Sequence, residues 1–587
     1  MPASPADPLA RRAGELRAAA RAWMADDPDP GDRAELAGLL EAGDLDGLAG
    51  RFAAPLAFGT AGIRGPMGAG PARMNRATVR RVTAGLAGYL RTAVPDAGRR
   101  LVVIGFDARR HSREFADEAA SVLTGAGLRV LRLPGPVPTP VVAFAVRHLG
   151  AAAGVMVTAS HNPRDDNGYK VYWSDGAQII PPVDAGIAAA AEQAGPLSAI
   201  PLGGPGEFLG EEVRDAYLAA IVPAALSDRG GDGGPASARR ELGLAYTPLH
   251  GVGLATFLRA FRQAGFPEPA VVPAQAEPDP AFPTLAKPNP EEPGALDLLI
   301  EEACRAGADL AMANDPDADR LAAVIPDPSA ARGWRVLTGD EIGALLGAHL
   351  LARAPDPGRR LLVTTVVSSS LLGELAAAAG ARYAETLTGF KWIMRAAGEV
   401  PGTTFLFGYE EALGYAVTDI VRDKDGISAA LALADAAAQA KRDGGSLAGL
   451  LDDLARRFGL YATDQWSLDL RPEGPGASGF LEAVRCAPPA SLLGQPVVTV
   501  DDLVLGARVH RDGAKEPLAL PRSDVVIWRC ADGTRVAVRP SGTEPKVKIY
   551  QQVVLPAAGH SDLAPLRAQA ARRLARLREE VTEVLDL

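Results

Sequence analysis

The chain has 587 residues, enough for about four domains of ~150 residues each. Hydrophobic residues make up 47% and charged residues 22% of the chain, as in ordinary water-soluble globular proteins. The sequence contains no run of about 18 apolar residues that could cross a membrane, and its first residues lack the apolar core of a secretory signal. The net charge of −10 argues against a nucleic-acid binder, and three distant cysteines form neither a disulfide framework nor a CxxC metal site. We therefore expect a cytoplasmic, multidomain protein without a membrane or nucleic-acid partner.

The first ~50 residues are expected to form two amphipathic helices. The second is expected to begin at Asp32, an acidic N-cap followed three residues later by Glu35. No catalytic motif lies in this region, so we expect it to pack against the first domain.

From Leu101 onward the sequence repeats one pattern three times, with strands alternating with helices. Strands are expected at 101–105, 128–133 and 153–159, then at 242–246, 270–274 and 308–314, and again at 361–367, 381–385 and 403–408. Helices are expected between them, at 112–125, 139–149, 252–264, 294–305, 370–379 and after Gly389. Such βαβαβ runs favour parallel strands covered by helices on both faces.

The last ~120 residues follow a different pattern. Strands at 525–530, 534–538 and 546–554 are expected to be antiparallel neighbours, followed by a helix at 563–585. Stretches rich in proline and glycine at 196–210, 228–236 and 472–479 are expected to be linkers or surface loops.

A dense polar loop ends a strand in each of the three α/β units: SHNP after residue 159, DPDADR after 314 and YEEALG after 408. Ligands of open parallel sheets bind outside the carboxyl ends of the strands. The three loops could therefore face one central cleft.

The first loop, Thr158 to Pro163, places Ser160 on a tight turn ended by a proline. The G-x-S-x-G elbow of hydrolases is absent. A hydroxyl held there could carry a transferable phosphoryl group, or it could simply satisfy backbone donors in the turn.

The second loop carries three alternating carboxylates, Asp315, Asp317 and Asp319, followed by Arg320. The carboxylates repel one another unless a cation lies between them, and hard oxygen ligands suit Mg²⁺. An EF-hand is excluded, because its sixth position would be Arg320 in place of glycine. A metal site is favoured over a solvated acidic turn.

The third region combines several weaker signals, and each could also be a solvated surface. Glu410 and Glu411 are a carboxylate pair that could accept hydrogen bonds from vicinal sugar hydroxyls. Further polar candidates precede and follow this pair: Thr388, Gly389, Phe390 and Lys391, then Arg422 and Lys424, which could reach an anion.

The fourth loop resembles an anion nest, with Arg539, Ser541, Gly542 and Thr543 between two strands. An arginine fork suits a phosphate monoester, and the spacing is not that of a Walker A loop. Near the N-terminus, Gly59 to Gly65 form another glycine-rich loop that contains Arg64.

The order of these motifs closely resembles that of the α-D-phosphohexomutase superfamily, the phosphoglucomutases and phosphomannomutases. The motifs are FGTAGIRG, TASHNP, DPDADR, GYEEALG and RPSGTEPKVKIY, and the resemblance covers the chain from about residue 50. It implies an α/β fold of three similar α/β domains with mixed sheets plus a C-terminal α+β domain around a central cleft. It also implies a phosphoryl group moved between C1 and C6 (or C5) of a sugar phosphate through a bisphosphate intermediate.

The resemblance implies a role for each loop. Ser160 would be the phosphoserine, and Asp315, Asp317 and Asp319 would bind Mg²⁺ together with the phosphate on Ser160. Arg539, Ser541, Gly542 and Thr543 would hold the non-reacting phosphate, and Arg320 would help to neutralise the phosphoserine. Lys170 is expected to exchange a proton with the sugar hydroxyl, with Arg64 and His161 as partners, and its pKa would have to be lowered for that role.

Within the superfamily, the sequence resembles the phosphoglucomutase-2/phosphopentomutase branch most. The N-terminal extension with DDPDP and RAELAGLL, and the TGFKWI and GYEEALG loops, carry this resemblance. Hexose-type enzymes commonly have serine where this chain has Ala412, which leaves glucose, ribose and deoxyribose phosphates open as substrates. Phosphoglucomutase is the first expectation, phosphopentomutase and phosphomannomutase are alternatives, and a Mg²⁺-dependent sugar-phosphate phosphatase or a non-enzymatic sensor would belong to other classes.

The expected domain organisation has an N-terminal extension followed by four domains. The extension covers 1–50, domain 1 covers 51–208, domain 2 covers 209–330, domain 3 covers 331–458 and domain 4 covers 459–587. The expected cofactors are Mg²⁺ and an activating sugar bisphosphate, and the expected assembly is a monomer or weak homo-oligomer.

Overall fold

The computed structural model describes residues 8–56, 58–59, 62–96, 100–226, 235–330, 332–469, 476–540 and 546–585. The chain forms two compact units. Unit 1 contains Met1–Val324 and Thr418–Leu431, and unit 2 contains Ile325–Val417 and Ala432–Leu587. Across the described ranges, each helix is too short or too polar to cross a bilayer.

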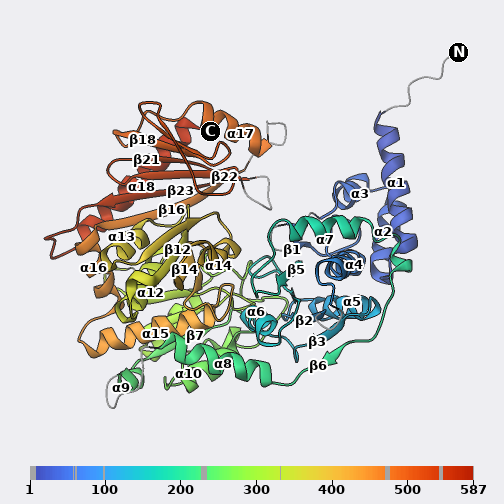
Figure 1. Ribbon diagram of the computed structural model, residues 1–587, viewed down its shortest axis with the longest axis horizontal. Coiled ribbons are helices and arrows are strands. Elements are labelled where there is room, and N and C mark those ends of the chain that lie inside the picture. The colour runs from blue at the N-terminus through green and yellow to red at the C-terminus, as the bar shows by residue number, and fades with distance from the viewer. Residues whose placement is uncertain are drawn as a thin grey trace. The chain divides into compact units, whose positions relative to one another are not determined.

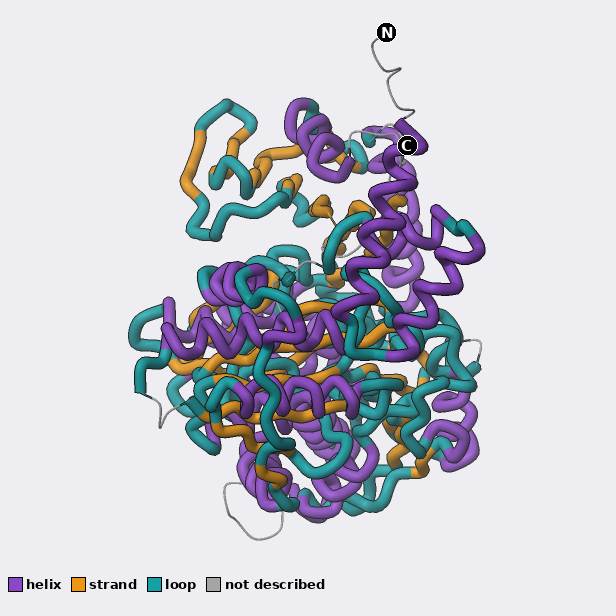
Figure 2. Tube along the Cα trace, turned by 90° about the vertical axis from the view of Figure 1, so that its right-hand side faces the viewer, coloured by secondary structure: helices purple, strands orange, loops and turns teal. Residues whose placement is uncertain are grey.

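The N-terminal extension of unit 1 consists of three adjacent helices, α1 (Pro8–Asp26), α2 (Pro30–Ala42) and α3 (Leu45–Phe52) (Figures 1 and 2). The expectation of two helices, the second starting at Asp32, is wrong. Helix α2 begins at Pro30, and the Asp29 carboxylate caps it by accepting the N–H groups of Gly31 at 2.8 Å and Asp32 at 3.3 Å. Proline is well suited to a first helical position, because its missing N–H would have no partner there.

The extension packs against the segment that follows the first strand of unit 1. Ala20, Leu36 and Leu48 share a small core with Ala69. A second anchor is the Asp26 carboxylate, which accepts the N–H groups of Leu197 at 2.7 Å and of Ser198.

The first sheet of unit 1 is mixed, with the strand order β1-β5-β4-β2-β3-β6. Its strands are β1 (Gly62–Pro66), β2 (Leu101–Phe106), β3 (Arg129–Arg132), β4 (Ala153–Val157), β5 (Asp166–Trp173) and β6 (Glu207–Phe208). Strands β3, β2 and β4 are parallel, whereas β5 is antiparallel to both of its neighbours, β4 and β1. Strands β2 and β4 are buried along their whole length, which explains their continuous apolar sequences.

Helices cover both faces of this sheet (Figure 1). They are α4 (Arg76–Ala93), α5 (Ser112–Gly125), α6 (Thr139–His148) and α7 (Val183–Glu192). The main core lies between the sheet and the α4, α5 and α7 layer.

The second sheet of unit 1 repeats the layout with β10, β9, β7 and β8 side by side. Its elements are α8 (Glu212–Ala225), α9 (Pro235–Arg239), β7 (Leu244–Thr247), α10 (Leu254–Gln263), β8 (Ala270–Val271), α11 (Asp297–Ala306), β9 (Leu310–Ala313) and β10 (Ala322–Pro326). Strands β8, β7 and β9 are parallel, and β10 returns antiparallel to β9. The metal-loop motif therefore connects β9 with β10.

Unit 2 begins with a third α/β layout, whose sheet has the order β13-β12-β14-β15. Its elements are α12 (Gly339–Arg353), β12 (Arg360–Thr365), α13 (Leu371–Ala379), β13 (Arg382–Thr386), α14 (Phe390–Glu399), β14 (Thr404–Glu410), β15 (Gly414–Ala416), α15 (Gly426–Arg442) and α16 (Leu447–Phe458). The short strand β11 (Trp334–Val336), which precedes α12, is not part of this sheet but pairs with β10. Thr338 and Glu341 form a capping box that starts α12, which then packs against β14.

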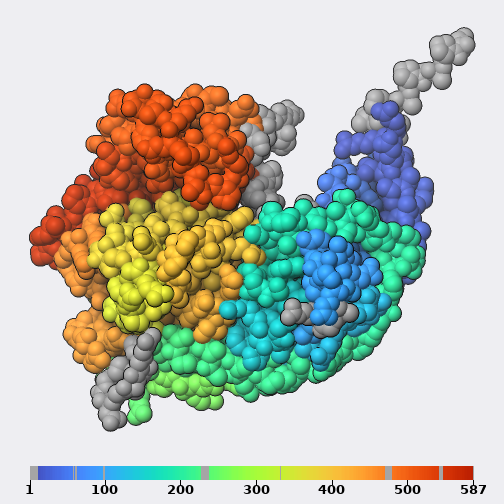
Figure 3. Space-filling view, viewed as in Figure 1, coloured from blue at the N-terminus to red at the C-terminus, as the bar shows by residue number. Residues whose placement is uncertain are grey.

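The C-terminal part of unit 2 is an antiparallel sheet with helices on one face and the third sheet's domain on the other. Its elements are β16 (Leu460–Asp469), α17 (Gly476–Cys486), β17 (Ser491–Leu492), β18 (Gln495–Asp502), β19 (Ala507–His510), β20 (Lys515–Pro517), β21 (Val526–Cys530), β22 (Arg535–Pro540), β23 (Lys546–Leu555) and α18 (Ala564–Val584). Helices α17 and α18 contact the sheet, and the opposite face packs against Val366 and Val367. In the space-filling view, orange and red residues of this part cover the yellow residues of the preceding domain (Figure 3).

The expected fold is confirmed: three α/β domains with mixed sheets and a C-terminal α+β domain. Two of the expected linkers need correction. The 196–210 stretch contains β6, because Leu131 of β3 pairs with Glu207 and extends the sheet by one strand. Helix α17 already begins at Gly476, within the expected 472–479 linker. Most of the third expected linker, 228–236, lies outside the described residues, as does 470–475.

Candidate active site

Ser160 lies on a tight turn directly after β4 and is only 4% exposed. Its backbone is left-handed, with a φ of 54°. This conformation costs about 1–3 kcal/mol for residues other than glycine and persists only where the surroundings fix it. Thr158 begins this fixation, because its hydroxyl accepts the Ser160 N–H at 2.9 Å and donates to Asp107 at 2.6 Å.

Arg109 holds the rest of the serine loop through backbone carbonyls. Its Nη2 donates to the carbonyls of Ser160 and Asn162, both at 2.6 Å, and its Nη1 donates to those of Pro163 at 2.8 Å and Asp166 at 3.3 Å. The guanidinium is almost completely buried, with its Nε 3.5 Å from the Asp107 carboxylate. One planar cation therefore determines the path of the turn that carries Ser160.

The three carboxylates of the DPDADR loop meet the serine loop at the carboxyl end of β9. Asp315, Asp317 and Asp319 are all fully buried, and their ligand oxygens lie within 4.8 Å of one another. The Ser160 hydroxyl donates to Asp315 Oδ2 at 2.8 Å. The structure therefore brings the predicted phosphoryl-carrying serine and the predicted metal loop together.

Two lysines approach the acidic triad. Lys170 Nζ lies 2.7 Å from Asp317 Oδ2 and 3.0 Å from Asp319 Oδ2, and Lys424 Nζ lies 3.4 Å from Asp319 Oδ2. Burial alone would lower the pKa of Lys170, but the charges of Asp317 and Asp319 outweigh it and raise that pKa above its usual range. The expected lowering of the Lys170 pKa is therefore wrong for this arrangement, because the two ion pairs favour the protonated ammonium.

The surroundings shift the pKa values of Asp315 and Asp317 in opposite directions. Burial, together with the charges of Asp317 and Asp319, raises the pKa of Asp315 well above its usual range. Burial also acts to raise the pKa of Asp317, but the Lys170 charge and the hydrogen bonds to this carboxylate outweigh it and lower that pKa. One of those bonds is donated by the Thr139 hydroxyl, at 2.6 Å. Without a cation in the site, Asp315 is therefore the carboxyl that favours a proton, and Asp317 stays ionised beside Lys170.

The donor set of the triad fits a hard divalent cation. Asp317 Oδ1 and Asp319 Oδ1 are buried and lack a hydrogen-bond partner among the residues that the structure describes. An unsatisfied buried carboxylate oxygen is costly, and oxygen-only ligands are those that Mg²⁺ prefers. The serine oxygen next to Asp315 completes a set of oxygen donors that a shared cation would satisfy.

Arg64, His161 and Lys170 lie around the same serine. Arg64 on β1 pairs with Gly168 on β5, two residues before Lys170, so both side chains leave the same face of the sheet. His161 Nδ1 lies 3.1 Å from Ser160 Oγ. Burial lowers the pKa of His161 well below its usual range, and the charges of Arg320, Arg64, Arg109 and Lys170 lower it further, so the imidazole is neutral.

The GIRG motif owes its glycine to this strand pairing. Gly62 has a φ of 124°, and a Cβ there would lie 1.9 Å from the Tyr169 carbonyl oxygen. Only glycine therefore lets β1 approach β5 closely enough to place Arg64 beside Lys170.

The Thr418–Leu431 segment adds Arg422 and Lys424 to unit 1. It is anchored by Asp423, whose Oδ2 accepts hydrogen bonds from the Tyr172 hydroxyl at 2.7 Å and from Gln178 at 2.8 Å. Arg422 lies 3.6 Å from Asp175, while Lys424 faces the triad. The sequence expectation that this segment reaches an anion site therefore has a geometric basis for Lys424.

Arg320 closes the metal loop. Its backbone N–H donates to Asp315 Oδ1 at 3.0 Å, and its Nη1 lies 3.1 Å from Glu291 Oε2. Arg320, the predicted partner of the phosphoserine, thus directly follows Asp319, and the Glu291 carboxylate holds its guanidinium.

The predicted sugar-binding residues lie in unit 2. Thr388 and Gly389 precede α14, whose first residues Phe390 and Lys391 are buried, with Lys391 Nζ 5.5 Å from the centre of the Trp392 ring. Glu410 ends β14.

Glu411, the second carboxylate of the predicted pair, turns toward its own domain. Its Oε2 accepts hydrogen bonds from the hydroxyls of Ser368 at 2.8 Å and Thr365 at 3.1 Å. Glu411 therefore already has hydrogen-bond partners within its own domain.

Of the predicted phosphate-binding residues, Arg539 lies near the end of β22. Its Nη2 and Nε donate to the Tyr550 hydroxyl at 2.9 Å and 3.3 Å. Ser541, Gly542 and Thr543 lie outside the described residues.

Sequence reasoning missed Arg109, Asp107 and Thr139, which hold the two catalytic loops. Arg109 contacts backbone carbonyls more than 50 positions away, and Thr139 begins α6, so neither belongs to a local motif with the loop it supports. The DARR sequence after β2 was the available signal, because charged residues at the carboxyl end of a buried strand lie at the binding edge of a sheet.

Comparisons with known proteins agree with this geometry. The chain matches three family descriptions: "Phosphoglucomutase/phosphomannomutase, alpha/beta/alpha domain I" over residues 55–197, domain II over 217–328 and domain III over 338–458. The chain belongs to the phosphoglucomutase/phosphomannomutase family. The superfamily resemblance deduced from the motifs is thereby confirmed.

Relatives of this family member are similar over most of their length. A "probable phosphomannomutase" of Haemophilus influenzae is 40% identical over 486 residues, covering 81% of this chain and 92% of the relative. A "probable phosphoribomutase" of Schizosaccharomyces pombe is 37% identical over 560 residues, covering 92% and 93%. A solved phosphoglucomutase/phosphomannomutase family protein from Burkholderia thailandensis shares the fold, with a TM-score of 0.65, 21% identity and coverage of 90% and 97%.

These matches establish the general activity. The protein is a phosphosugar mutase of the phosphohexomutase type, an enzyme that transfers a phosphoryl group within its substrate. The family is Mg²⁺-dependent, and the buried acidic triad of this chain can hold such an ion.

Proposed function

We propose that this mutase moves a phosphoryl group between C1 and C6 (or C5) of a sugar phosphate by way of phosphorylated Ser160, and that glucose phosphate is its main substrate. The observation that carries the proposal is the 2.8 Å contact between the Ser160 hydroxyl and Asp315, beside two buried carboxylate oxygens without partners in the described ranges. A phosphoryl group on Ser160 would thus lie next to the place where its charge can be balanced.

Asp315, Asp317, Asp319 and the phosphate on Ser160 would hold the Mg²⁺ ion. When bound, the ion would neutralise phosphoryl charge and polarise the bond to the serine oxygen. The fixed turn around Ser160 would aim the phosphoryl group toward the sugar hydroxyl, and the neutral His161 would orient the serine oxygen through the 3.1 Å contact.

Lys170 is the group proposed to exchange a proton with the sugar hydroxyl, with Arg64 beside it on the same face of the sheet. In the first half-reaction the sugar oxygen bonds to phosphorus as the serine oxygen leaves, and the sugar proton passes to the base. Lys170 can take this proton only as a neutral amine, so its own proton must first leave to solvent, and the ion pairs with Asp317 and Asp319 oppose that loss. Neutralising the charge of the triad weakens both pairs.

The remaining predicted residues would bind the substrate. Glu410, together with Thr388, Gly389, Phe390 and Lys391, would contact the sugar, with Glu411 behind it. Arg539, Ser541, Gly542 and Thr543 would hold the phosphate that does not react, and Arg320, Arg422 and Lys424 would balance charge near the serine. A sugar bisphosphate is proposed as the activator, because it can rephosphorylate Ser160.

The domain boundaries are proposed as 51–208, 209–330, 331–458 and 459–587 after an extension of residues 1–50. We propose a monomer or weak homo-oligomer as the assembly. Ala412 offers no hydroxyl next to the glutamate pair, so ribose and deoxyribose phosphates are alternative substrates. Mannose phosphate is a further alternative within the same enzyme class.

A coupled assay of Ser160→Ala against the wild type tests the proposal. With glucose 1-phosphate, ribose 1-phosphate and mannose 1-phosphate as substrates, the wild type should turn over glucose 1-phosphate fastest, and Ser160→Ala should abolish isomerisation while keeping its far-UV circular dichroism. Ser121→Ala, a serine of α5 in the same unit, is the control and should keep full activity. Retained turnover by Ser160→Ala would remove the covalent route, and release of inorganic phosphate in place of isomer would favour a phosphatase.

A further inference from the structure

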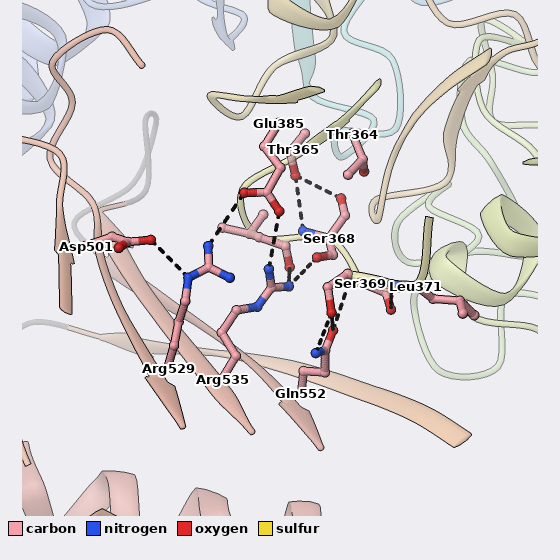
Figure 4. A network of polar contacts seen from close by, with 12 residues as sticks. Thr364, Thr365, Ser368, Ser369, Leu371, Glu385, Asp501, Arg529, Arg535 and Gln552 are labelled. Carbon is pink, nitrogen blue, oxygen red and sulfur yellow. Dashed lines mark hydrogen bonds and ion pairs between the residues drawn. The ribbon is translucent and has the colours of Figure 1, made fainter. Parts of the chain in front are cut away.

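The turn after β12 contacts both the C-terminal sheet, as Figure 4 shows for Arg535 and Gln552, and the predicted sugar loop at Glu411. It consists of three consecutive serines, Ser368, Ser369 and Ser370, between β12 and α13. Side chains of the C-terminal sheet bind it from one side, and Glu411 binds it from the other.

Two neighbouring residues of the C-terminal sheet grip this turn. Arg535 on β22 and Gln552 on β23 are register partners. Arg535 Nη2 donates to the Ser368 carbonyl. Gln552 Oε1 accepts the Ser370 N–H at 2.9 Å, and its Nε2 donates to the Ser370 hydroxyl at 2.9 Å. We call these three contacts with the serine turn the clasp.

The same turn supports the predicted sugar loop. The Ser368 hydroxyl donates to Glu411 Oε2 at 2.8 Å and accepts the Glu411 N–H at 3.2 Å. Thr365 donates a second hydrogen bond to this carboxylate, at 3.1 Å. Ser368 therefore fixes the backbone of Glu411 through its hydroxyl, and Arg535 fixes Ser368 through its carbonyl.

Strand β22 links Arg535 of the clasp to the predicted phosphate-binding Arg539. Arg535, Ala537 and Arg539 alternate along β22 and so face the same side of the sheet. Ala537 packs with Val366 and Val367 in the apolar contact between the two domains. Four residues of an extended strand span about 13 Å, which is the distance along β22 from the clasp to the predicted phosphate-binding Arg539.

A contribution to folding stability does not explain well why an arginine is buried at position 535. The residue is 4% exposed, and its nearest carboxylate contact is Glu385 Oε1 at 4.0 Å from Nη1. Removing a cation from water costs more than such a distant partner returns. Its guanidinium donates to the backbone carbonyls of Ser368 and, at 3.5 Å, of Val367, which favours a role in positioning the turn after β12.

We propose that the clasp fixes the spacing between the sugar loop at Glu410 and Glu411 and the phosphate loop that starts at Arg539, which makes Arg535 and Ser368 positioning residues for phosphosugar binding. The proposal rests on the proposed function of these two loops. A phosphosugar must engage both loops at once, whereas inorganic phosphate needs only one. The clasp therefore contributes to affinity for the whole substrate and not to affinity for phosphate alone.

The test uses full-length Arg535→Gln, Arg535→Lys, Ser368→Ala and the Arg535→Gln/Ser368→Ala double variant. Arg508→Gln is the control, because Arg508 is a partly exposed arginine of the same sheet paired with Asp501. KM for the best phosphosugar and Ki for inorganic phosphate are measured for each variant. Hydrogen exchange of the 409–414 amides is measured in the same proteins without substrate.

Arg535→Gln should raise KM for the phosphosugar by about tenfold or more, as expected for loss of a charged hydrogen bond, with Ki for phosphate within about twofold of the wild type. Arg535→Lys keeps a charged donor, so its KM for the phosphosugar should lie between those of the wild type and Arg535→Gln. The double variant should be no worse than Arg535→Gln, because both substitutions interrupt one connection. Exchange at 409–414 should be faster in Arg535→Gln and Ser368→Ala but not in Arg508→Gln.

Equal rises in KM and Ki, or additive effects in the double variant, would overturn the proposal. If Arg535→Gln does not fold, Ser368→Ala and Arg535→Lys decide the same question. If the wild type turns over no phosphosugar, the proposed function fails, and hydrogen exchange still decides whether the clasp orders the Glu411 loop.

Discussion

Arg109 offers the sharpest test of how the protein positions Ser160, the proposed phosphoryl carrier. The guanidinium donates to four carbonyls of the serine loop, three of them at 2.8 Å or less. An ammonium is a single point and cannot reach all four. If Arg109→Lys loses two of these charged hydrogen bonds at about 1.5–3 kcal/mol each, and relaxation offsets part of the loss, about 3 kcal/mol remains.

This energy should appear in the chemical step. About 3 kcal/mol corresponds to a roughly hundredfold fall in kcat if the loop no longer holds Ser160 in its left-handed conformation. KM should stay near the wild-type value, because the predicted sugar and phosphate loops belong to unit 2. Arg109→Gln should also lower the free energy of unfolding, by about 3–5 kcal/mol, because Asp107 would remain buried without its cation.

Steady-state kinetics and the fraction of phosphorylated Ser160, measured by intact mass after incubation with a sugar bisphosphate, check both expectations. Arg113→Lys is the matched control, since Arg113 is an exposed arginine on α5 four residues further along. A kcat of Arg109→Lys within about twofold of wild type would refute the reasoning, because it would mean that the carbonyl contacts do not position Ser160.

Three further predictions concern the triad and the GIRG strand. Asp317→Asn removes a carboxylate with an unpartnered oxygen and should lower the Mg²⁺-dependent rate by about a hundredfold or more; an unchanged magnesium titration would contradict the metal assignment. Burial beside Asp317 raises the pKa of Asp315, so the metal-free protein loses stability as pH rises through that raised value. Metal-free Asp315→Asn should therefore lose less stability than the wild type between mildly acidic and mildly basic pH in thermal unfolding; an equal loss would contradict this. Gly62→Ala would place a methyl group 1.9 Å from the Tyr169 carbonyl oxygen. It should lower the free energy of unfolding in urea by about 1–3 kcal/mol, and it should lower kcat because Arg64 is displaced. Wild-type values for both quantities would contradict the steric argument.

Local motifs were the part of the site that the sequence could predict. SHNP and DPDADR each follow a buried strand, and the positions of Ser160 and Asp315 follow from that placement. The same reasoning found the alternating strands and helices, because their hydrophobic periodicity is local.

Contacts between distant segments could not be predicted in this way. Arg109 binds carbonyls, which leave no mark in the side-chain pattern of the loop it holds. Lys170 was expected to have a lowered pKa, but its ion pairs with Asp317 and Asp319 depend on a loop more than 140 positions away.

Errors at element ends had a similar origin. Aspartate is a favoured N-cap residue, and Asp32 was therefore predicted to start the helix. Helix α2 instead begins at Pro30, and Asp29 is its N-cap. The 196–210 stretch reads as a linker because β6 is only two residues long and depends on β3 for its pairing.

The Thr418–Leu431 segment limits how this enzyme can be divided. The chain leaves unit 1 after Val324, returns for these residues and leaves it again, so unit 1 is not one continuous stretch of sequence. A fragment that stops at Val324 would lose the lysine beside Asp319 and would leave the hydroxyl of Tyr172 without the carboxylate of Asp423. A gene truncation or a domain exchange at that boundary would therefore not transfer an intact unit 1. Only a design that includes the returning segment would do so.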